Sequence, residues 1–336
     1  MPKNPFALLL ALLGVLLILE TAEADGPTVG MILPLTGPAA PFGAIVKRGV
    51  DRAVSPAHRL TVEDDACDPA KAISAFHSLR QRGSRLFLGP CCTTSMTAIA
   101  PIIKKEGLLA MNVCTGSERV WGLSGQRIFH SQMSAEEESR QNAEMMWTRG
   151  IRSVVLLYAE QEYALAHERA FRDAFKGAVV QSLSFSGSDS GQVKSLVLKL
   201  KSLKFDALYI PIMEPFLLGV LTQAAKIGAK PPNVFSVFSF ELPEVLAMEG
   251  INAEGVIYSY PDIPSDQPAA EYFAGTGAQL FMDAVNKCTD DTDCALQETI
   301  KSNRFDTKGF LKGKFIWKTV RGGKFVNLSA RPQGEN

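Results

Sequence analysis

Five residues with reactive or hydrogen-bonding side chains follow one another at 91–95, in the order Cys-Cys-Thr-Thr-Ser. They stand between a short apolar run at 85–89, which predicts a strand, and an apolar pattern typical of a helix. Thr93, Thr94 and Ser95 are therefore expected at a helix N-terminus, where unpaired N–H groups and the helix dipole favour a carboxylate. A single hydroxyl could merely cap the helix, but three in a row favour ligand binding by at least one of them.

Two aromatic residues also follow predicted strands, and ligands of open parallel sheets bind beyond the carboxyl ends of the strands. Phe42 lies in the loop 34–43, and Tyr163 follows the strand predicted at 152–158. We expect both rings to cover the apolar body of a ligand. The alternative for each is an ordinary contact at the edge of the core.

Two acidic residues are candidates for the counter-charge of a ligand ammonium. Glu241 follows the apolar strand predicted at 233–238, and the alternative for it is a solvated surface position. Glu214 competes for the same role, but Pro215 beside it makes a position at the start of a helix the alternative.

The six cysteines fall into two groups. Cys288 and Cys294 enclose an acidic loop and are expected to form a disulfide across it. The other group lies at one edge of the predicted sheet, at Cys67, Cys91, Cys92 and Cys114. One bridge there would fasten two loops, and a bridge between Cys91 and Cys114 could be another, because both follow strands that neighbour each other in some strand orders. The residues alone leave this connectivity open.

Charge and histidine content exclude several classes of function. Lys+Arg and Asp+Glu number 35 each and are scattered, which argues against a nucleic-acid partner or an anionic membrane surface. The four histidines show no pairing at ligand spacing and there is no Cys-x-x-Cys, so we expect no metal site and no cofactor. No histidine accompanies a plausible nucleophile, so we predict no catalytic residues; an enzyme with a reactive thiolate at Cys91 or Cys114 is the alternative.

The N-terminus has the pattern of a signal peptide. Lys3 precedes an apolar run at 6–19 that is too short to cross a bilayer core of about 30 Å. Ala22 and Ala24 occupy the small-residue positions required for cleavage, which we place after Ala24. We therefore expect residues 1–24 to be removed and the mature chain to be exported; an uncleaved anchor is the alternative.

The rest of the chain alternates strands with helices, which predicts an α/β fold with parallel sheets covered on both faces. The first series of predicted strands is 28–33, 59–64, 85–89 and 108–112, and the second is 152–158, 179–185, 207–212, 233–238 and 255–260. The break between the series near 147–151 predicts two lobes of similar build. Residues 113–145 are less regular, apart from a helix predicted at 134–147 with Ser134 as its cap. A helix at 269–288, another at 294–303 and a hairpin at 314–329 are expected to pack back onto both lobes.

The sequence resembles a type I periplasmic solute-binding protein of the leucine/isoleucine/valine-binding branch that serves ABC importers. The segments that carry the resemblance are 30–43, 64–73, 88–101, 107–112, 161–166 and 253–256. The resemblance implies two doubly wound parallel-sheet lobes, joined by three crossovers, that close around a ligand by a hinge. It implies a first lobe of 25–148 with about 262–308, and a second of 149–261 with about 309–336.

The same resemblance implies a binding site that draws on both lobes. The ligand carboxylate would be held by hydroxyl and backbone groups at Cys92, Thr93, Thr94 and Ser95, and again at Thr115, Gly116 and Ser117. Phe42 and Tyr163 would correspond to the aromatic residues of such sites, and Glu241 to the residue that takes the ammonium. A disulfide between Cys67 and Cys92 is also implied, which leaves Cys91 as an extra cysteine.

The expected function is the periplasmic component of an ABC importer that captures a branched-chain or related amino acid. Its partners would be one small molecule and the membrane permease, with the chain acting as a monomer. Ala164, Leu165 and Ala166 stand where the family commonly has glycines, and the loop 211–218 is bulky and apolar. These departures make an aromatic or aliphatic carboxylate, an amide or an alcohol the alternative ligand. A sensor module for another membrane or enzyme system is the alternative role.

Overall fold

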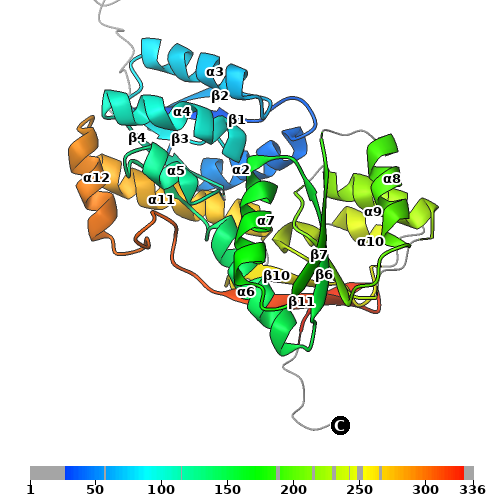
Figure 1. The fold of residues 1–336 in the computed structure, drawn as a ribbon. Coiled ribbons are helices and arrows are strands. Elements are labelled where there is room, and N and C mark those ends of the chain that lie inside the picture. Colours follow the sequence, from blue (N-terminus) through cyan, green and yellow to red (C-terminus); the bar gives the residue numbers. More distant parts are fainter. Residues whose placement is uncertain are drawn as a thin grey trace, which may run out of the picture.

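We describe the protein from a computed structural model that covers residues 27–328, except 57, 115, 187–189, 214–215, 229–231, 242, 248–252 and 265–266. Two sheets, each flanked by helices on both faces, form two lobes that lie side by side (Figure 1). The predicted signal peptide, residues 1–24, lies outside the described residues. Within the described ranges, no helix is both long and apolar enough to cross a membrane.

The first sheet has the strand order β2-β1-β3-β4-β5, and all neighbouring strands are parallel. Its strands are β1 Thr28–Leu33, β2 Arg59–Asp64, β3 Leu86–Leu88, β4 Leu109–Asn112 and β5 Ile128–His130. The first four match the predicted strands closely. Strand β5 was not predicted, because its three residues lie in the irregular stretch 113–145, without the longer apolar run that marks β3.

Helices cover both faces of this sheet. They are α2 Ala40–Ala53, α3 Pro69–Gln81, α4 Thr93–Glu106 and the short α5 Arg119–Leu123. The start of α3 follows the sequence prediction: the Asp68 carboxylate accepts hydrogen bonds from the N–H groups of Ala70 and Lys71, and Pro69 fits the first turn. Gly107 ends α4 in the left-handed conformation, at φ 64°, which glycine adopts without strain.

One face of the first sheet is covered by a helix from much later in the chain. Helix α11, Ala269–Cys288, packs against α2 (Figure 1). The two helices approach so closely at Gly49 that a Cβ there would lie 2.2 Å from the carbonyl oxygen of Glu271. Arg48 and Arg52 of α2 form ion pairs with the nearly buried Glu271 carboxylate and fix the same contact. Residues far apart in sequence therefore build one core.

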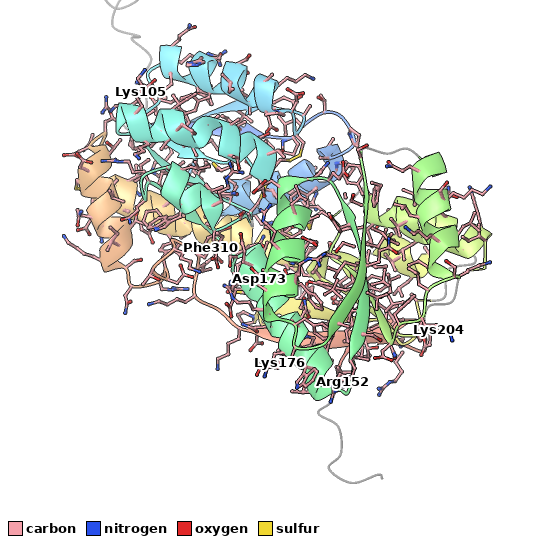
Figure 2. The ribbon with its side chains drawn as sticks, viewed as in Figure 1. Lys105, Arg152, Asp173, Lys176, Lys204 and Phe310 are labelled. Atoms are coloured by element: carbon pink, nitrogen blue, oxygen red, sulfur yellow. A yellow bond between two sulfur atoms is a disulfide. The ribbon has the colours of Figure 1, made fainter. Side chains whose placement is uncertain are left out.

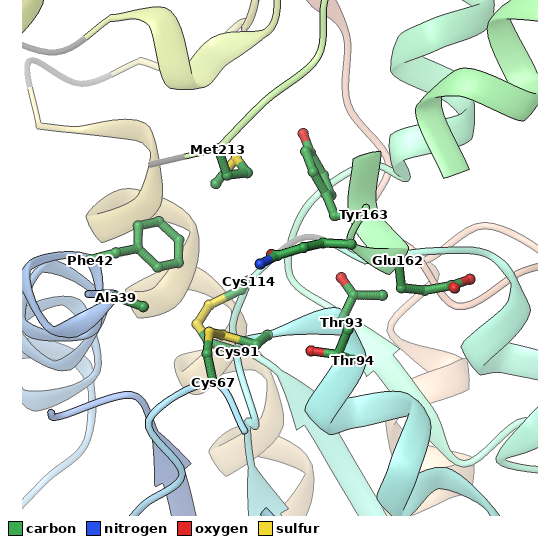
Figure 3. Close-up of a pocket in the computed structure, with 12 residues that line it drawn as sticks. Ala39, Phe42, Cys67, Cys91, Thr93, Thr94, Cys114, Glu162, Tyr163 and Met213 are labelled. Atoms are coloured by element: carbon green, nitrogen blue, oxygen red, sulfur yellow. A yellow bond between two sulfur atoms is a disulfide. The ribbon is translucent and has the colours of Figure 1, made fainter. Parts of the chain in front are cut away.

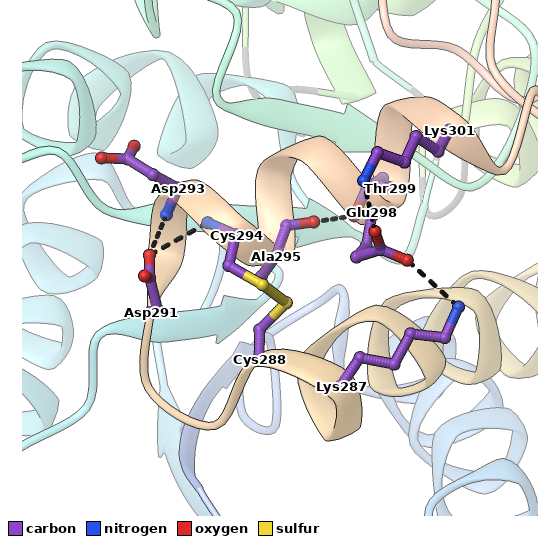
Figure 4. Close-up of a disulfide and its surroundings, with 9 residues drawn as sticks. All are labelled: Lys287, Cys288, Asp291, Asp293, Cys294, Ala295, Glu298, Thr299 and Lys301. Atoms are coloured by element: carbon purple, nitrogen blue, oxygen red, sulfur yellow. Dashed lines mark hydrogen bonds and ion pairs between the residues drawn. A yellow bond between two sulfur atoms is a disulfide. The ribbon is translucent and has the colours of Figure 1, made fainter.

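Helix α12, Thr292–Lys301, is joined to the end of α11 by a short turn that a disulfide closes. Cys288 and Cys294 form the predicted bridge, with their Cα atoms 5.6 Å apart (Figure 4). The Asp291 carboxylate caps α12 by accepting the N–H groups of Asp293 and Cys294. The expected helix at 294–303 is thus confirmed, beginning two residues earlier.

The second sheet has the order β12-β11-β10-β9-β8-β6-β7. Its strands are β6 Ser153–Ala159, β7 Ala178–Phe185, β8 Ala207–Ile210, β9 Val234–Ser236, β10 Ile257–Pro261, β11 Phe315–Arg321 and β12 Lys324–Asn327. Only β11 pairs antiparallel to its two neighbours, so the predicted C-terminal hairpin extends this sheet at one edge. Successive residues of β6 point to opposite faces, and both faces are buried.

Helices again lie on both faces of the second sheet. They are α6 Ala135–Thr148, α7 Glu162–Ala174, α8 Ser190–Leu200, α9 Phe216–Lys226 and α10 Pro243–Ala247, with a 3₁₀ turn η1 at Phe238–Phe240. Helices α6 and α7 pack together on one face, and α8 and α9 on the other (Figure 1). Ser134 caps α6 as predicted, through its hydroxyl and the Glu137 N–H.

The chain crosses between the sheets three times: after β5, after β10 and after α12. The first and third crossovers touch where the His130 ring stacks on Phe310, with centroids 4.2 Å apart and planes 5° from parallel. Phe310 lies inside the molecule, whereas Lys105 and Lys204 extend from its outer edges (Figure 2). These connecting segments are the positions at which a hinge movement of the two lobes would occur.

The position of α6 bears on the lobe boundaries. The sequence-based division assigns residues up to 148 to the first lobe, but α6 packs on α7 and contacts the second sheet. Its apolar side, including Met146, joins the same core as Val154 and Leu156 of β6. We therefore propose that the second lobe begins at the first crossover, between β5 and α6.

Candidate ligand-binding site

A pocket lies at the carboxyl ends of β1, β3 and β4, where the first lobe faces the N-terminus of α7 (Figure 3). Its wall has residues from both lobes: Ala39, Phe42, Cys67, Cys91, Cys92, Thr93, Thr94, Cys114, Gln161, Glu162, Tyr163 and Met213. This is the sheet edge at which the sequence places the ligand, and it brings the 91–94 segment and Tyr163 together.

The first-lobe wall supplies hydrogen-bond donors. Cys92 is the N-cap residue of α4, and its side chain makes no capping hydrogen bond because its sulfur is bonded to Cys67. Thr93 and Thr94 form the first turn, whose N–H groups have no intrahelical acceptor. Both residues line the pocket. The positive end of the helix dipole and two hydroxyls therefore meet there, which suits an anionic group.

Two disulfides form the floor of the pocket. Cys67 pairs with Cys92, and Cys91 pairs with Cys114, with Cα separations of 5.4 and 5.3 Å. Figure 3 shows Cys67, Cys91 and Cys114 side by side below the pocket. The bridges tie the loop after β3 to the loop after β2 on one side and to the loop after β4 on the other. Three loops of the binding edge are thereby cross-linked into one unit.

The remaining wall is mainly apolar. Phe42, in the first turn of α2, and Met213, from the second lobe, face the space between the lobes (Figure 3). Tyr163 presents its ring to the pocket, while its hydroxyl points away and donates to Glu138 Oε2 at 3.3 Å. A ligand in this pocket meets carbon and sulfur on most sides and hydrogen-bond donors at one end.

Glu162 is the one charged residue among the described lining residues. Its carboxylate accepts a hydrogen bond from Arg169 at 3.1 Å and lies 3.7 Å from an Arg119 guanidinium nitrogen. Figure 3 shows it pointing away from Phe42 and Met213. Arg119 belongs to α5 of the first lobe, so the ion pair between Arg119 and Glu162 links the two lobes beside the pocket. The Glu162 carboxylate does not point into the pocket.

The other expected first-lobe residues are placed outside the pocket lining. Ser95 is fully buried, and its hydroxyl has no hydrogen-bond partner within the described residues. Gly116 packs against the His130 ring, where a Cβ would lie 2.7 Å from Cε1. The Ser117 hydroxyl donates to Glu136 Oε1 at 2.6 Å. These three residues support the loops that carry the pocket. Thr115 and Glu214 lie outside the described residues.

Glu241 has partners within the second lobe. Lys318 Nζ lies 2.5 Å from Glu241 Oε2, and the Tyr258 hydroxyl donates to the same oxygen at 2.7 Å. Both side chains of the ion pair are mostly buried, at 15% and 19% exposed. Glu241 is not among the lining residues. Its carboxylate forms an ion pair with Lys318 of the neighbouring strand β11, and its expected role as the partner of a ligand ammonium stays a prediction.

Sequence reasoning missed Gln161, Met213 and Glu138. Gln161 and Met213 line the pocket, and both follow strands of the second sheet, β6 and β8, which is the signal that would have found them. Glu138 lies in the helix α6, in the run 136–138 of glutamates, and nothing in the sequence distinguishes it from the half-buried Glu136 and Glu137. Its burial is known only from the packing of α6 on the second sheet.

Comparison with known proteins agrees with this geometry. A family model described as "Periplasmic binding protein" matches residues 27–292. The Leu/Ile/Val-binding protein of Escherichia coli (strain K12) is 22% identical over 346 aligned positions, covering 88% of this chain and 92% of its own. A Pseudomonas aeruginosa protein that binds leucine, isoleucine, valine, threonine and alanine is 21% identical, covering 71% and 67%.

Solved structures share the fold. A solute-binding protein from R. palustris in complex with benzoate superposes with a TM-score of 0.80 at 17% identity, covering 90% of this chain and 95% of its own. A leucine-binding protein from Thermotoga maritima gives a TM-score of 0.76 at 18% identity, covering 90% and 98%. With two parallel-sheet lobes, three crossovers and a pocket between their carboxyl edges, the chain belongs to the periplasmic binding protein family, of the type that serves ABC transporters.

Proposed function

We propose that the protein captures a small carboxylate with an apolar body, such as an aromatic or branched aliphatic acid, and delivers it to the membrane permease of an ABC importer. The observation that carries this proposal is the composition of the pocket. Donors converge at the N-terminus of α4, and Phe42, Met213, the Tyr163 ring and two disulfides surround the rest. The carboxylate would bind at Thr93 and Thr94, and the apolar body would lie between the aromatic side chains.

Closure of the two lobes would provide the affinity. The first lobe offers the anion site, and the second offers the Tyr163 ring and Met213, so only the closed form contacts the ligand from both sides. The mature protein would act as a monomer in the periplasm after removal of residues 1–24. The family supports this location, and no step of the proposal requires a cofactor or a chemical reaction.

A branched-chain amino acid is the second candidate ligand. Relatives with Leu/Ile/Val-binding activity in their names support it, and so does the acidic Glu162 at the pocket edge. The structural observation against it is that Glu241 is paired with Lys318 and that Glu162 is paired with Arg169. Among the described lining residues, no acidic group is left to compensate a buried ammonium, which is costly to bury alone.

Matched ligand pairs test these two candidates. Leucine and 4-methylpentanoate share one skeleton and differ in the ammonium, whereas benzoate and benzamide differ in the anionic group. We expect thermal stabilisation of the refolded, ligand-free protein by 4-methylpentanoate or benzoate, and none by leucine or benzamide at the same concentration. Stronger stabilisation by leucine than by 4-methylpentanoate would overturn the first candidate in favour of the second. Native mass spectrometry of freshly purified protein would identify any ligand carried through purification.

A further inference from the structure

A buried carboxyl group lies directly behind the pocket wall. Glu138, on α6, is 2% exposed. Its Oε1 accepts hydrogen bonds from the Ser259 hydroxyl at 2.6 Å and from the Phe238 N–H at 3.3 Å. Its Oε2 accepts one from the Tyr163 hydroxyl at 3.3 Å. Every polar atom of the group is therefore directed to a partner, and one of these partners is a wall residue of the pocket.

His167 completes the surroundings of this carboxyl. Its ring packs edge-on against Tyr163, with centroids 4.6 Å apart, and its Nε2 lies 3.7 Å from Glu138 Oε2. Its Nδ1 lies 2.7 Å from the Ser139 hydroxyl and 3.3 Å from the Tyr209 hydroxyl. The groups facing Glu138 thus come from α7, β8, β10 and η1.

Burial of the Glu138 carboxyl group lowers the stability of the fold. Among the described residues, no lysine or arginine pairs with Glu138, and an uncompensated buried charge destabilises a fold. Burial raises the pKa of Glu138 to about 7 and lowers the pKa of His167 to about 3. The histidine therefore stays neutral, and Glu138 is the group of this cluster that changes charge near neutral pH. An apolar residue would fill the same space without this cost, so stability alone does not explain the glutamate.

We propose that Glu138 is a positioning residue for ligand binding, which holds Tyr163 by its hydroxyl so that the ring forms a fixed wall of the pocket. The inference rests on the proposed function only for the identity of the ligand, because the contact between Glu138 and Tyr163 exists without one. Fixing the ring before binding lowers the entropy that the ligand would otherwise have to overcome. Since α6 begins at the first crossover, the same contact connects the hinge to the pocket wall.

The first test reads Tyr163 without any ligand. The protein is labelled with ¹³Cζ-tyrosine, and the Tyr163 resonance among the six tyrosines is assigned with Y163F. We expect this resonance to shift between pH 5 and 9 with a midpoint near 7, because the hydroxyl donates more strongly to an ionised carboxyl. The shift should disappear in E138Q and persist in E144Q, which alters an exposed glutamate of the same helix. A Tyr163 resonance that is independent of pH, or that titrates equally in E138Q, overturns the proposal.

The second test measures binding of benzoate by calorimetry. We expect E138L to weaken binding by roughly three- to tenfold, the value of one lost hydrogen bond, and E138Q to restore most of it through its amide oxygen. In a Y163F background the same substitutions should have no further effect, which a merely structural role of Glu138 would not produce. Equal losses in both backgrounds would contradict the positioning role. If benzoate does not bind the wild type, the proposed ligand class fails, while the resonance of Tyr163 still decides the role of Glu138.

Discussion

Lys318 of β11 and Glu241 form an ion pair of 2.5 Å in the second lobe, and the Tyr258 hydroxyl donates to the same carboxylate. Lys318 and Tyr258 are opposite each other in the antiparallel pair β10–β11, so the C-terminal hairpin supplies the cation. The Lys318 ammonium also lies 4.4 Å from the centre of the Tyr260 ring. The Glu241 carboxylate thus contacts both strands of the β10–β11 pair and helps to attach the C-terminal hairpin to the sheet.

This relationship predicts the effect of E241Q. Loss of the anion leaves a mostly buried Lys318 without its charged partner, so we expect the free energy of unfolding to fall by about 1–2 kcal/mol. Benzoate affinity should remain within about twofold of the wild type, since Glu241 does not line the pocket. Urea unfolding and calorimetry measure the two quantities. A variant that keeps its stability but loses leucine binding would restore Glu241 to a ligand role.

The anion site predicts the effect of T93V. Valine has the shape of threonine without the hydroxyl, so the variant should fold normally and bind benzoate about tenfold more weakly, as for a lost hydrogen bond to a charged group. The matched control is T97V, one turn further along α4, where the threonine hydroxyl has no partner within the described residues and does not line the pocket. If T93V and T97V bind benzoate equally, the carboxylate does not lie at the N-terminus of α4.

The disulfides at the pocket floor are expected to support ligand binding as well as stability. Replacement of Cys91 and Cys114 by alanine should cost about 3 kcal/mol of stability, because the bridge closes a long loop of 23 residues' separation. It should also weaken benzoate binding by roughly tenfold, since the loops after β3 and β4 are no longer held together.

The bridge between Cys288 and Cys294 is the control for this effect. It lies at the end of α11, away from the lining residues, and closes a separation of six residues (Figure 4). Its replacement by alanine should cost about 2 kcal/mol and leave binding unchanged. Similar losses of affinity in both double variants would show that the floor bridges act only through global stability. Thermal unfolding and calorimetry on the two variants make the comparison.

The buried Glu138 predicts how stability depends on pH. The unfolded chain releases this proton near pH 4.5, but the folded chain retains it to about 7, so stability from this group is lost as the pH rises through that window. The loss amounts to about 3 kcal/mol, since one pKa unit corresponds to ~1.4 kcal/mol. E138Q should lack this slope, while E144Q keeps it. Urea unfolding from pH 4.5 to 8 tests the prediction; equal slopes in the wild type and E138Q would contradict it.

Much of the fold could be predicted because its signals are local. Asp68 followed by Pro69 sets the start of α3, Ser134 sets the start of α6, and the apolar runs place the strands of both sheets. The same is true of the 91–94 segment, whose position at the junction of β3 and α4 places it at the sheet edge that carries the pocket. The pairing of Cys67 with Cys92 came from the family resemblance and is present in the structure.

The environments of several side chains could not be predicted, because they depend on residues that are distant in sequence and meet only in the folded protein. Ser95 and Ser117 have the same chemistry as Thr93, but Ser95 is buried inside the first lobe and the Ser117 hydroxyl donates to Glu136. Glu241 meets Lys318 only because a hairpin from the C-terminus joins the sheet next to β10. Glu138 is one glutamate among several in α6, and its burial follows from the packing of that helix on the second lobe.

The late position of α11 in the sequence has a consequence for synthesis of the chain. Until residues 269–288 leave the ribosome, the face of α2 around Gly49 and Val50 stays open to water, although all five strands of the first sheet have long been made. The core of the first lobe can therefore close only after the strands of the second sheet up to β10 have been made.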